Sequence, residues 1–477
     1  MVRSGPVHFK RHTGVGGTNP SASYARREPE HTVLYQVVKD HLRTFLAEAR
    51  ERSEHGFGLP GFVERELERY LECGLLCHGF ARVRCDDCGH DVLVPLSCKN
   101  RGVCPSCTTR RMHDTAAHLV DRVLPRAPYR QWVLSVPRRV RFLLARDASL
   151  LGEVLRIFLR VVFAWQRRRA RSRGIRGLCG SVTWVQRFGG HLNLNVHFHA
   201  LVPDGVFARA ADGSLHLHVL DPPGDADVAA LTRRIVRRIR ALLDPDRADD
   251  APSDALGAAQ ATAVMALPPV DGDAEVRVGQ HQSAFIEGFS LHAGTYVAAN
   301  DRLGLERVAR YAGRPPLALS RLTLTAAGKV AYRLKRPRKS GAPALVLTPL
   351  EFLGRLATLI PPPRRHLTRY HGVFAPNAAA RAAVVPPAPD ATDEAPSRTP
   401  GRVPATVLAR RLDWAALLAR VFTIDVLRCT ACGGRRRVLA FLTDPTVVAS
   451  VLVHLGLPSL PPPVAPARSP PPEVTTW

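Results

Sequence analysis

Two histidines in the stretch NLNVHFHALVPDG, which begins at Asn193, have the spacing of a metal-binding pair. Side chains alternate between the two faces of a strand, so His197 and His199 share one face with Asn193 and Asn195. Two imidazoles on one strand hold a divalent cation, and such an ion polarises a phosphate oxygen. The stretch therefore indicates a metal site suited to phosphate chemistry.

The same His-x-His spacing recurs at His216 and His218, on the next expected strand. No row of asparagines accompanies this second pair, which fits a solvated or cross-strand face. The spacing alone is therefore weak support for a metal site, and a further element is needed.

A tyrosine supplies that element, in the last turn of a helix that is capped by Asn300 or Asp301 and ends at Gly313 and Pro315. The basic residues beside Tyr311 are Arg307, Arg310 and Arg314. A phenol with its ordinary pKa of about 10 is a poor nucleophile. Guanidinium groups and a metal-bound phosphate favour its phenolate form. The alternative is a tyrosine that packs its ring and exposes its hydroxyl.

Paired cysteines predict a separate, structural metal site. Cys85-x2-Cys88 is followed by Cys104-x2-Cys107, which is the spacing of a four-thiolate zinc site. Each CxxC folds into a tight knuckle that aims two thiolates at one ion. We expect these four cysteines to bind one structural Zn²⁺.

The remaining cysteines leave alternatives open. Three cysteines and two histidines lie near the paired ones: Cys73, Cys77, Cys98, His78 and His90. They either bind a second ion, exchange with a ligand of the first, or pack as small apolar side chains. Cys429-x2-Cys432 supplies only two ligands, so it forms half of an intermolecular site or borrows partners.

The chain of 477 residues has a formal net charge of +26, which points to a polyanionic partner and foremost to nucleic acid. The alternative explanation is a GC-rich genome, which favours arginine throughout the protein. Two runs of arginines, at 167–176 and 233–240, are expected to lie on helices that flank the site. We expect these arginines to bind phosphates. No long uncharged apolar stretch and no signal peptide is visible, so we expect a cytosolic, reducing setting.

Hydrophobic periodicity predicts the elements that position these residues. Strands are expected at 131–136, 181–188, 191–202, 206–209 and 215–220, and helices at 149–171 and 225–243. This order predicts an α+β fold, with an antiparallel sheet backed by helices. The expected division is a disordered arm (1–31), a helical zinc-binding domain (32–122), a catalytic domain (123–376, with an insert at 245–278), a Pro/Ala-rich linker (377–406), a C-terminal segment with a CxxC (407–457) and a Pro-rich tail (458–477).

Five segments resemble successive blocks of one transposase family. They are 73–107, TWVQRFGGHLNLNVHFHALVPDGVF (183–207), FSLHAG (289–294), ERVARYAGRPPLALSRL (306–322) and RYHGVFAPNAAAR (369–381). The family is the insertion-sequence ninety-one type of HUH transposases. The resemblance implies an HUH endonuclease domain with a ferredoxin-like palm, preceded by a zinc-binding domain.

The resemblance also implies the site. His197 and His199 match the ligands of a catalytic Mg²⁺ or Mn²⁺, and Tyr311 matches the tyrosine that attacks single-stranded DNA at the transposon ends and keeps its 5′ end. We expect the residues that contact the DNA to be Arg307, Arg310, Arg314, Asn193 and Asn195.

The chain departs from the family's two-tyrosine members, which carry another tyrosine where this sequence has Arg307. It resembles the single-tyrosine branch, and Tyr296 is too far from the motif to substitute. Gln186 is the first candidate for the third metal ligand, followed by Asp204 and His292.

Two other functions fit parts of this pattern. A replication initiator or a conjugative relaxase uses the same chemistry, but the cysteine block and the segment 369–381 favour the transposase. A non-catalytic, zinc-stabilised DNA-binding protein is the second alternative, and the joint presence of His197, His199 and Tyr311 argues against it.

Overall fold

The structure is a computed structural model that describes residues 26–53, 56–243, 256–257, 277–279, 281–335, 337, 341–385, 414–422 and 425–468. Most of the expected arm, insert and linker, and the end of the tail, lie outside the described residues.

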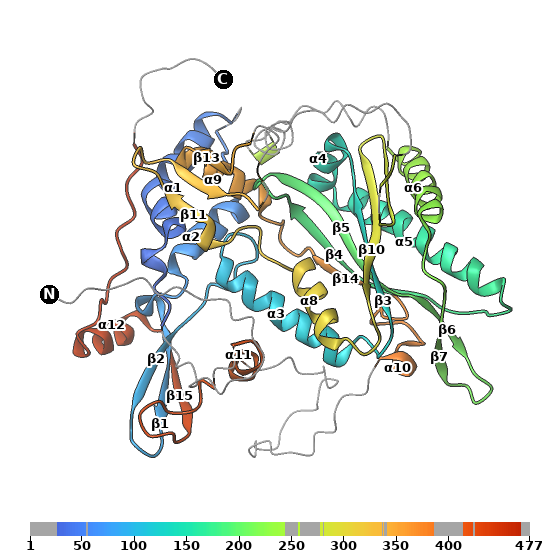
Figure 1. Cartoon of the computed structure of the whole chain (residues 1–477). Helices are drawn as coiled ribbons and strands as arrows, with labels where there is room; N and C mark the ends of the chain where they lie inside the picture. The colour runs from blue at the N-terminus through green and yellow to red at the C-terminus, as the bar shows by residue number, and fades with distance from the viewer. Residues whose placement is uncertain are drawn as a thin grey trace.

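A seven-stranded sheet forms the centre of the molecule, with the order β14-β4-β5-β3-β10-β9-β8 (Figure 1). Its strands are β3 (Tyr129–Ser135), β4 (Gly180–Phe188), β5 (Leu194–Pro203), β8 (Arg277–Gly279), β9 (Ser283–Ile286), β10 (Phe289–Val297) and β14 (Thr368–Gly372). Every neighbouring pair is antiparallel. The expected antiparallel α+β fold is confirmed.

The central part of this sheet has ferredoxin-like topology. β3 leads through α4 (Arg138–Arg146) and α5 (Ala148–Arg171) into the β4-β5 hairpin, and after a second hairpin α6 (Asp225–Arg240) leads through β8 and β9 to β10. This β-α-β-β-α-β order, with β5 and β3 in the middle of the four strands, is the split βαβ arrangement. β5, which carries the histidine pair, is thus a central strand with a neighbour on each side.

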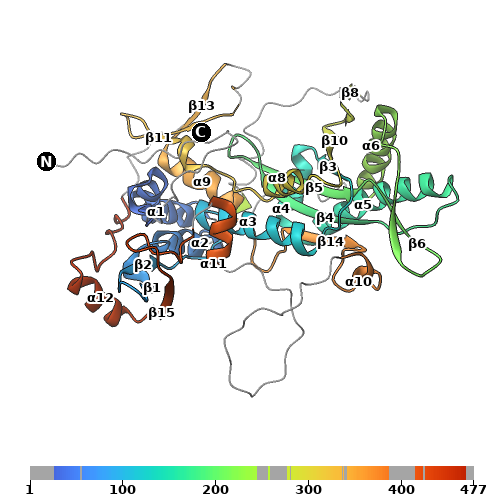
Figure 2. The same cartoon turned by 60° about the horizontal axis from the view of Figure 1, so that its bottom comes forward.

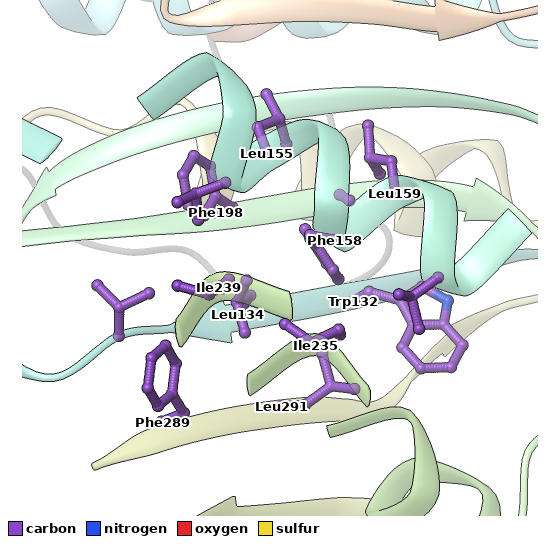
Figure 3. Packing of buried hydrophobic residues seen from close by; sticks show 14 of the residues in the cluster. Trp132, Leu134, Leu155, Phe158, Leu159, Phe198, Ile235, Ile239, Phe289 and Leu291 are labelled. Atoms are coloured by element: carbon purple, nitrogen blue, oxygen red, sulfur yellow. The ribbon is translucent and has the colours of Figure 1, made fainter. Parts of the chain in front are cut away.

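One face of the sheet packs on α4, α5 and α6 and forms a large hydrophobic core (Figure 3). Alternate residues of β3 and β5, such as Trp132 and Phe198, point into this core because side chains alternate along a strand. Helix α5 begins where Asp147 accepts hydrogen bonds from the main-chain N–H groups of Ser149 and Leu150. The odd-numbered residues of β5, including both histidines, are left for the other face.

The other face packs on α3 (Pro105–Arg122) and α8 (Arg302–Ala312). Apolar residues of α3 meet Leu305, Ala309 and Ala312 of α8, and both helices cover Val182 and Trp184 of β4. The Asp301 carboxylate accepts from Gly304 N at 2.6 Å, and the helix ends at Gly313, as the sequence predicted. This packing places the last turn of α8 over the histidine strand.

A helical region lies at the opposite end of the molecule from α5 and α6 (Figures 1 and 2). Its helices are α1 (Val33–Glu51), α2 (Gly61–Glu72) and α9 (Pro349–Leu359), beside a small sheet of β11 (Leu322–Leu324), β12 (Val330–Arg333) and β13 (Ala344–Leu347). All of these elements share one hydrophobic core. Residues 317–360, which we expected within the catalytic domain, therefore complete the core of the N-terminal helices.

The C-terminal segment joins the N-terminal region. β15 (Arg436–Leu442) pairs with β1 (Phe80–Cys85), which pairs with β2 (Asp91–Pro95), and α12 (Pro445–His454) packs beside them (Figure 2). Outside these units lie the hairpin of β6 (Gly205–Arg209) and β7 (Leu215–Val219), α10 (Arg381–Val384) and α11 (Trp414–Phe422). In the described part of the chain, no helix is both long and apolar enough to cross a membrane.

Candidate active site

The histidine pair lies on the face of β5 that α8 covers. The two rings have centroids 4.9 Å apart, and the residues are 8% and 4% exposed. His197 Nδ1 lies 2.7 Å from the main-chain oxygen of Asn195, which fixes the orientation of that ring. Among the described residues, neither ring nitrogen of His199 has a hydrogen-bond partner. Buried polar atoms without partners are rare, so this arrangement suits two metal ligands.

Burial keeps both imidazoles neutral. It lowers the pKa of His197 to about 4, with smaller contributions from Arg314 and Arg141. It lowers the pKa of His199 to about 3, and His197 and Arg314 act in the same direction. The neutral imidazole is the form that binds a metal. Arg141 of α4, which sequence reasoning missed, therefore adds positive charge near this pair.

Tyr311 lies beside the histidines, in the last turn of α8. Its ring centroid is 5.8 Å from that of His199, and the residue is 48% exposed. The exposed ring leaves the phenol open to a large substrate, while the buried imidazoles lie beneath it. The structure thus brings together the three residues that the sequence singled out.

Gln186 links the histidine strand to the tyrosine helix. It is directly opposite His197 in the β4-β5 pair, and it is 3% exposed. Its Nε2 donates to the main-chain oxygens of Tyr311, at 3.1 Å, and of Ala312, at 2.7 Å. Its Oε1 is buried and has no hydrogen-bond partner among the described residues. The amide oxygen therefore remains available to an ion held by the histidines.

The other two candidate ligands are less well placed. Asp204 forms a buried ion pair with Arg130 at 2.7 Å, beyond the far end of β5. His292 of β10 is in the same cross-strand row as His199, but Val133 of β3 stands between them. Two strand spacings amount to about 9.5 Å, and His292 also accepts from Gly294 N.

The three arginines of α8 and its end point in different directions. The Arg314 guanidinium lies over the Tyr311 ring, 4.8 Å from its centroid, and 5.2 Å from that of Phe188. Arg307 pairs with Asp301 at 3.7 Å and is largely exposed. Arg310 is close enough to His113 of α3 to lower the pKa of that histidine, for which burial is the larger cause. Only Arg314 contacts the tyrosine ring.

Asn193 and Asn195, which were expected on the same face of the strand as the histidines, do not both continue that face. The register of the β4-β5 pair shifts between Gln186 and Phe188, and β5 begins at Leu194. Asn193 is buried in the turn, where its side chain donates to Leu194 O and leaves no room for a Cβ at Gly189. The side-chain oxygen of Asn195 is buried without a partner in the described structure. Asn193 therefore has a turn-forming position, and only Asn195 stays beside the histidines.

The predicted zinc ligands divide between two clusters, so the expected single site is wrong. Cys104 and Cys107 meet Cys73 and Cys98 in a fully buried cluster, which we call cluster 1. Its sulfur–sulfur distances include 3.5 Å for Cys73–Cys104 and 3.6 Å for Cys98–Cys107. Thiolates around zinc at about 2.3 Å lie about 3.8 Å apart in a tetrahedron, so cluster 1 has the dimensions of a zinc site.

Cluster 2 consists of Cys85, Cys88, Cys429 and Cys432. Cys85 lies 3.5 Å from Cys432, and Cys88 lies 3.6 Å from Cys429, sulfur to sulfur. The C-terminal CxxC thus borrows its partners from the N-terminal one within the same chain. Sequence spacing joined Cys85 and Cys88 to the next CxxC because it carries no information on strand pairing between β1 and β15.

Cys77 and the two nearby histidines belong to neither cluster among the described residues. Cluster 1 includes Cys104 as the N-cap of α3 and Cys107 in the first turn of that helix. Since α3 packs on α8, the buried cluster fixes the helix against which the tyrosine helix rests.

The two arginine runs do not flank this site. They lie at the end of α5 and just after it, and on α6; these helices cover the face of the sheet opposite to the histidines. Sequence could not decide the face, because the helices precede and follow the site strand in the chain. His216 and His218 lie on the exposed β7, as the sequence indicated.

Two sequence families match the chain. Residues 38–136 match a family described as "Transposase zinc-binding domain", and residues 180–382 match a family described as "Putative transposase". No curated protein and no solved structure matches the chain. The segment that matches the first family contains cluster 1, and the segment that matches the second contains the histidine pair, Gln186 and Tyr311.

Proposed function

Because the chain belongs to the insertion-sequence ninety-one family of transposases, with an N-terminal zinc-binding domain, we propose that it nicks single-stranded DNA at transposon ends. The observation that carries this proposal is the approach of the exposed Tyr311 ring to the buried His199 ring, at 5.8 Å. A transposase binds DNA and acts as a DNA-cleaving and strand-transferring enzyme. The proposal adds a tyrosine nucleophile and a catalytic divalent cation to this activity.

The residues present fit a divalent cation. The unpartnered nitrogens of His199 and the unpartnered Oε1 of Gln186 are buried polar atoms of the described structure, next to the oriented His197 ring. His197, His199 and Gln186 would hold Mg²⁺ or Mn²⁺, and the bound ion would polarise a phosphate oxygen. Two neutral nitrogens and one amide oxygen leave the charge of the ion to be balanced by the phosphate.

Tyr311 is the proposed nucleophile. Its phenolic oxygen forms a bond to phosphorus and the bond from phosphorus to the 3′ oxygen breaks. The phenol loses its proton to water, and the departing 3′ oxygen takes a proton from water and leaves as a hydroxyl. The 5′ end stays on the protein as a phosphotyrosine. This ester keeps the bond energy for a later joining step, and the free 3′-OH primes replication in a rolling-circle scheme.

The arginine over the tyrosine supports this role. Arg314 stacks on the Tyr311 ring, so its positive charge lies beside the phenol, where it would attract a phosphate. Arg307, in the position of a second tyrosine in relatives, is an exposed arginine paired with Asp301. We therefore propose a single-tyrosine enzyme.

A nicking assay tests the proposal. Purified protein with Mn²⁺ is incubated with an oligonucleotide that carries the end of the element, labelled on either side of the cut. We expect a free 3′-OH product and a protein–DNA adduct on the 5′ side, visible on denaturing gels. Tyr311→Phe should remove the adduct. If that variant still forms it, the nucleophile is another residue.

Tyr296→Phe is the matched control. Tyr296 is also exposed, at 54%, and also lies beneath an arginine, Arg130, at 5.5 Å. It is on β10 and lacks the histidine neighbours that Tyr311 has in the described structure. The control variant should keep the adduct at its full rate.

A further inference from the structure

Helix α8 carries a buried carboxylate on the side that faces α3. The Glu306 side chain is 9% exposed, and its Oε2 accepts from Arg420 Nη2 at 2.8 Å. The same guanidinium donates to Asp121 of α3, at 3.2 Å from Nη2. Arg420 therefore joins the two helices that cover the site face of the sheet.

Arg420 comes from α11, in the C-terminal segment, 114 residues after Glu306. The side chain of Arg420 is 29% exposed. A charged group left in a poorly solvated position without its partner is costly, so the carboxylate depends on the arrival of this arginine. The folding of the C-terminal segment is therefore coupled to the stability of α8.

Cluster 2 anchors the chain that follows α11. Cys429 and Cys432 follow Arg420 closely, and they meet Cys85 and Cys88 of the N-terminal region. β15 then pairs with β1, and Arg437 pairs with Asp86 at 2.8 Å. The segment that delivers Arg420 is thus attached to the zinc-binding domain just after the arginine.

The two clusters differ in exposure. All four cysteines of cluster 1 are buried, whereas Cys88 and Cys432 of cluster 2 are exposed. Cluster 2 also gathers its ligands from two distant parts of the chain. Cluster 2 therefore joins the C-terminal segment to the N-terminal region, whereas cluster 1 lies within the N-terminal region alone.

We propose that Arg420 is a positioning residue for the nucleophile helix, and that a metal ion in cluster 2 holds the C-terminal segment that delivers it. The inference rests on the proposed role of Tyr311. Arg420 and cluster 2 act through α8: they stabilise the helix on which the phenol is presented, and they leave DNA binding unchanged.

Hydrogen–deuterium exchange of α8 in the zinc-loaded, DNA-free, full-length protein tests the physical link. Arg420→Met should speed exchange of the α8 amides about tenfold, the effect expected when a hydrogen bond to a charged group is removed. Cys432→Ser should do the same without altering any residue that touches α8. Arg307→Met is the control, because it removes an exposed ion pair from the same helix and should leave the exchange unchanged.

Nicking kinetics separate positioning from a general structural effect. Arg420→Met should lower kcat about tenfold with KM unchanged, and Arg420→Lys should recover part of the loss. Adding Glu306→Gln to Arg420→Met should restore protection of α8, since no buried carboxylate on that helix is then left unpaired, whereas Asp121 of α3 is solvated. Unchanged exchange in Arg420→Met, or a rise in KM without a fall in kcat, would overturn the proposal.

The exchange measurement needs no catalysis, so it keeps the two proposals apart. If Tyr311→Phe still forms the adduct, the nucleophile assignment fails. Faster α8 exchange in Arg420→Met and Cys432→Ser would then still support the anchoring of this helix by the C-terminal segment.

Discussion

The side-chain amide of Gln186 donates to the main-chain oxygen of Tyr311 at 3.1 Å, across 125 positions of sequence. The same Nε2 also donates to the main-chain oxygen of Ala312, so it ties the end of α8 to β4. The Oε1 atom at the other side of the amide has no hydrogen-bond partner among the described residues. One residue thus connects the tyrosine helix with the proposed ion position.

Gln186→Ala should weaken metal binding and nicking together. The variant removes the proposed third ligand and the two hydrogen bonds to the end of α8, so the Mn²⁺ concentration for half-maximal nicking should rise about 10- to 100-fold. A Mn²⁺ titration of the nicking rate measures this. Gln166→Ala is the control, since Gln166 is also buried and donates to a main-chain oxygen, that of Pro203, on the other side of the sheet. An unchanged Mn²⁺ requirement in Gln186→Ala would remove it from the ligand set.

Asp204→Asn should destabilise the fold and leave the Mn²⁺ requirement unchanged. The variant leaves the buried Arg130 without its carboxylate, and breaking a buried ion pair costs about 3–5 kcal/mol in the free energy of unfolding. Urea denaturation at neutral pH measures the loss. Asp212→Asn, at an exposed turn, should change the stability little. A larger rise in the Mn²⁺ requirement than in Gln186→Ala would instead make Asp204 a ligand.

The zinc content should be two ions per chain. Each cluster has four sulfurs with the spacing of a zinc site, so elemental analysis of the purified protein should give two equivalents. Cys73→Ser and Cys429→Ser should each remove about one equivalent, and Cys179→Ser should remove none because this buried cysteine belongs to neither cluster. If neither Cys73→Ser nor Cys429→Ser lowers the zinc content, the ligands are instead the four cysteines predicted from spacing: Cys85, Cys88, Cys104 and Cys107.

The arginines of α6 should bind DNA phosphates without taking part in nicking. The variant replaces four of them by glutamine: Arg233, Arg234, Arg237 and Arg238. They line the exposed side of α6, and Arg234 borders an open hollow of about 440 Å³ between α5 and α6. For single-stranded DNA, the slope of log affinity against log salt should fall by about 0.7 for each phosphate that the variant no longer neutralises.

The control for that variant removes the same charge from α1, its C-cap and α2. It replaces Arg43, Arg52, Arg65 and Arg69 by glutamine. Fluorescence anisotropy at several salt concentrations compares the two proteins. An equal change of slope in both would mean that net charge, rather than this face, attracts the DNA.

The sequence alone determined the elements and the residues that do chemistry. Period-two alternation placed His197 and His199 on one face of a strand, and cap and stop residues placed Tyr311 in the last turn of a helix, because both signals are local. The antiparallel α+β fold followed from the order of hairpins and helices. The joint presence of the five sequence segments that resemble one transposase family indicated the family.

Only the tertiary structure decided which cysteines meet. Cys85 and Cys88 lie close in sequence to Cys104 and Cys107, yet the pairing of β15 with β1 brings Cys429 and Cys432 to them instead. The same holds for the arginine runs, whose face depends on how α5 and α6 cross the sheet, and for Arg420, which reaches Glu306 from the far end of the chain. Spacing reports neighbours along the chain, whereas these contacts depend on long-range strand pairing and helix packing.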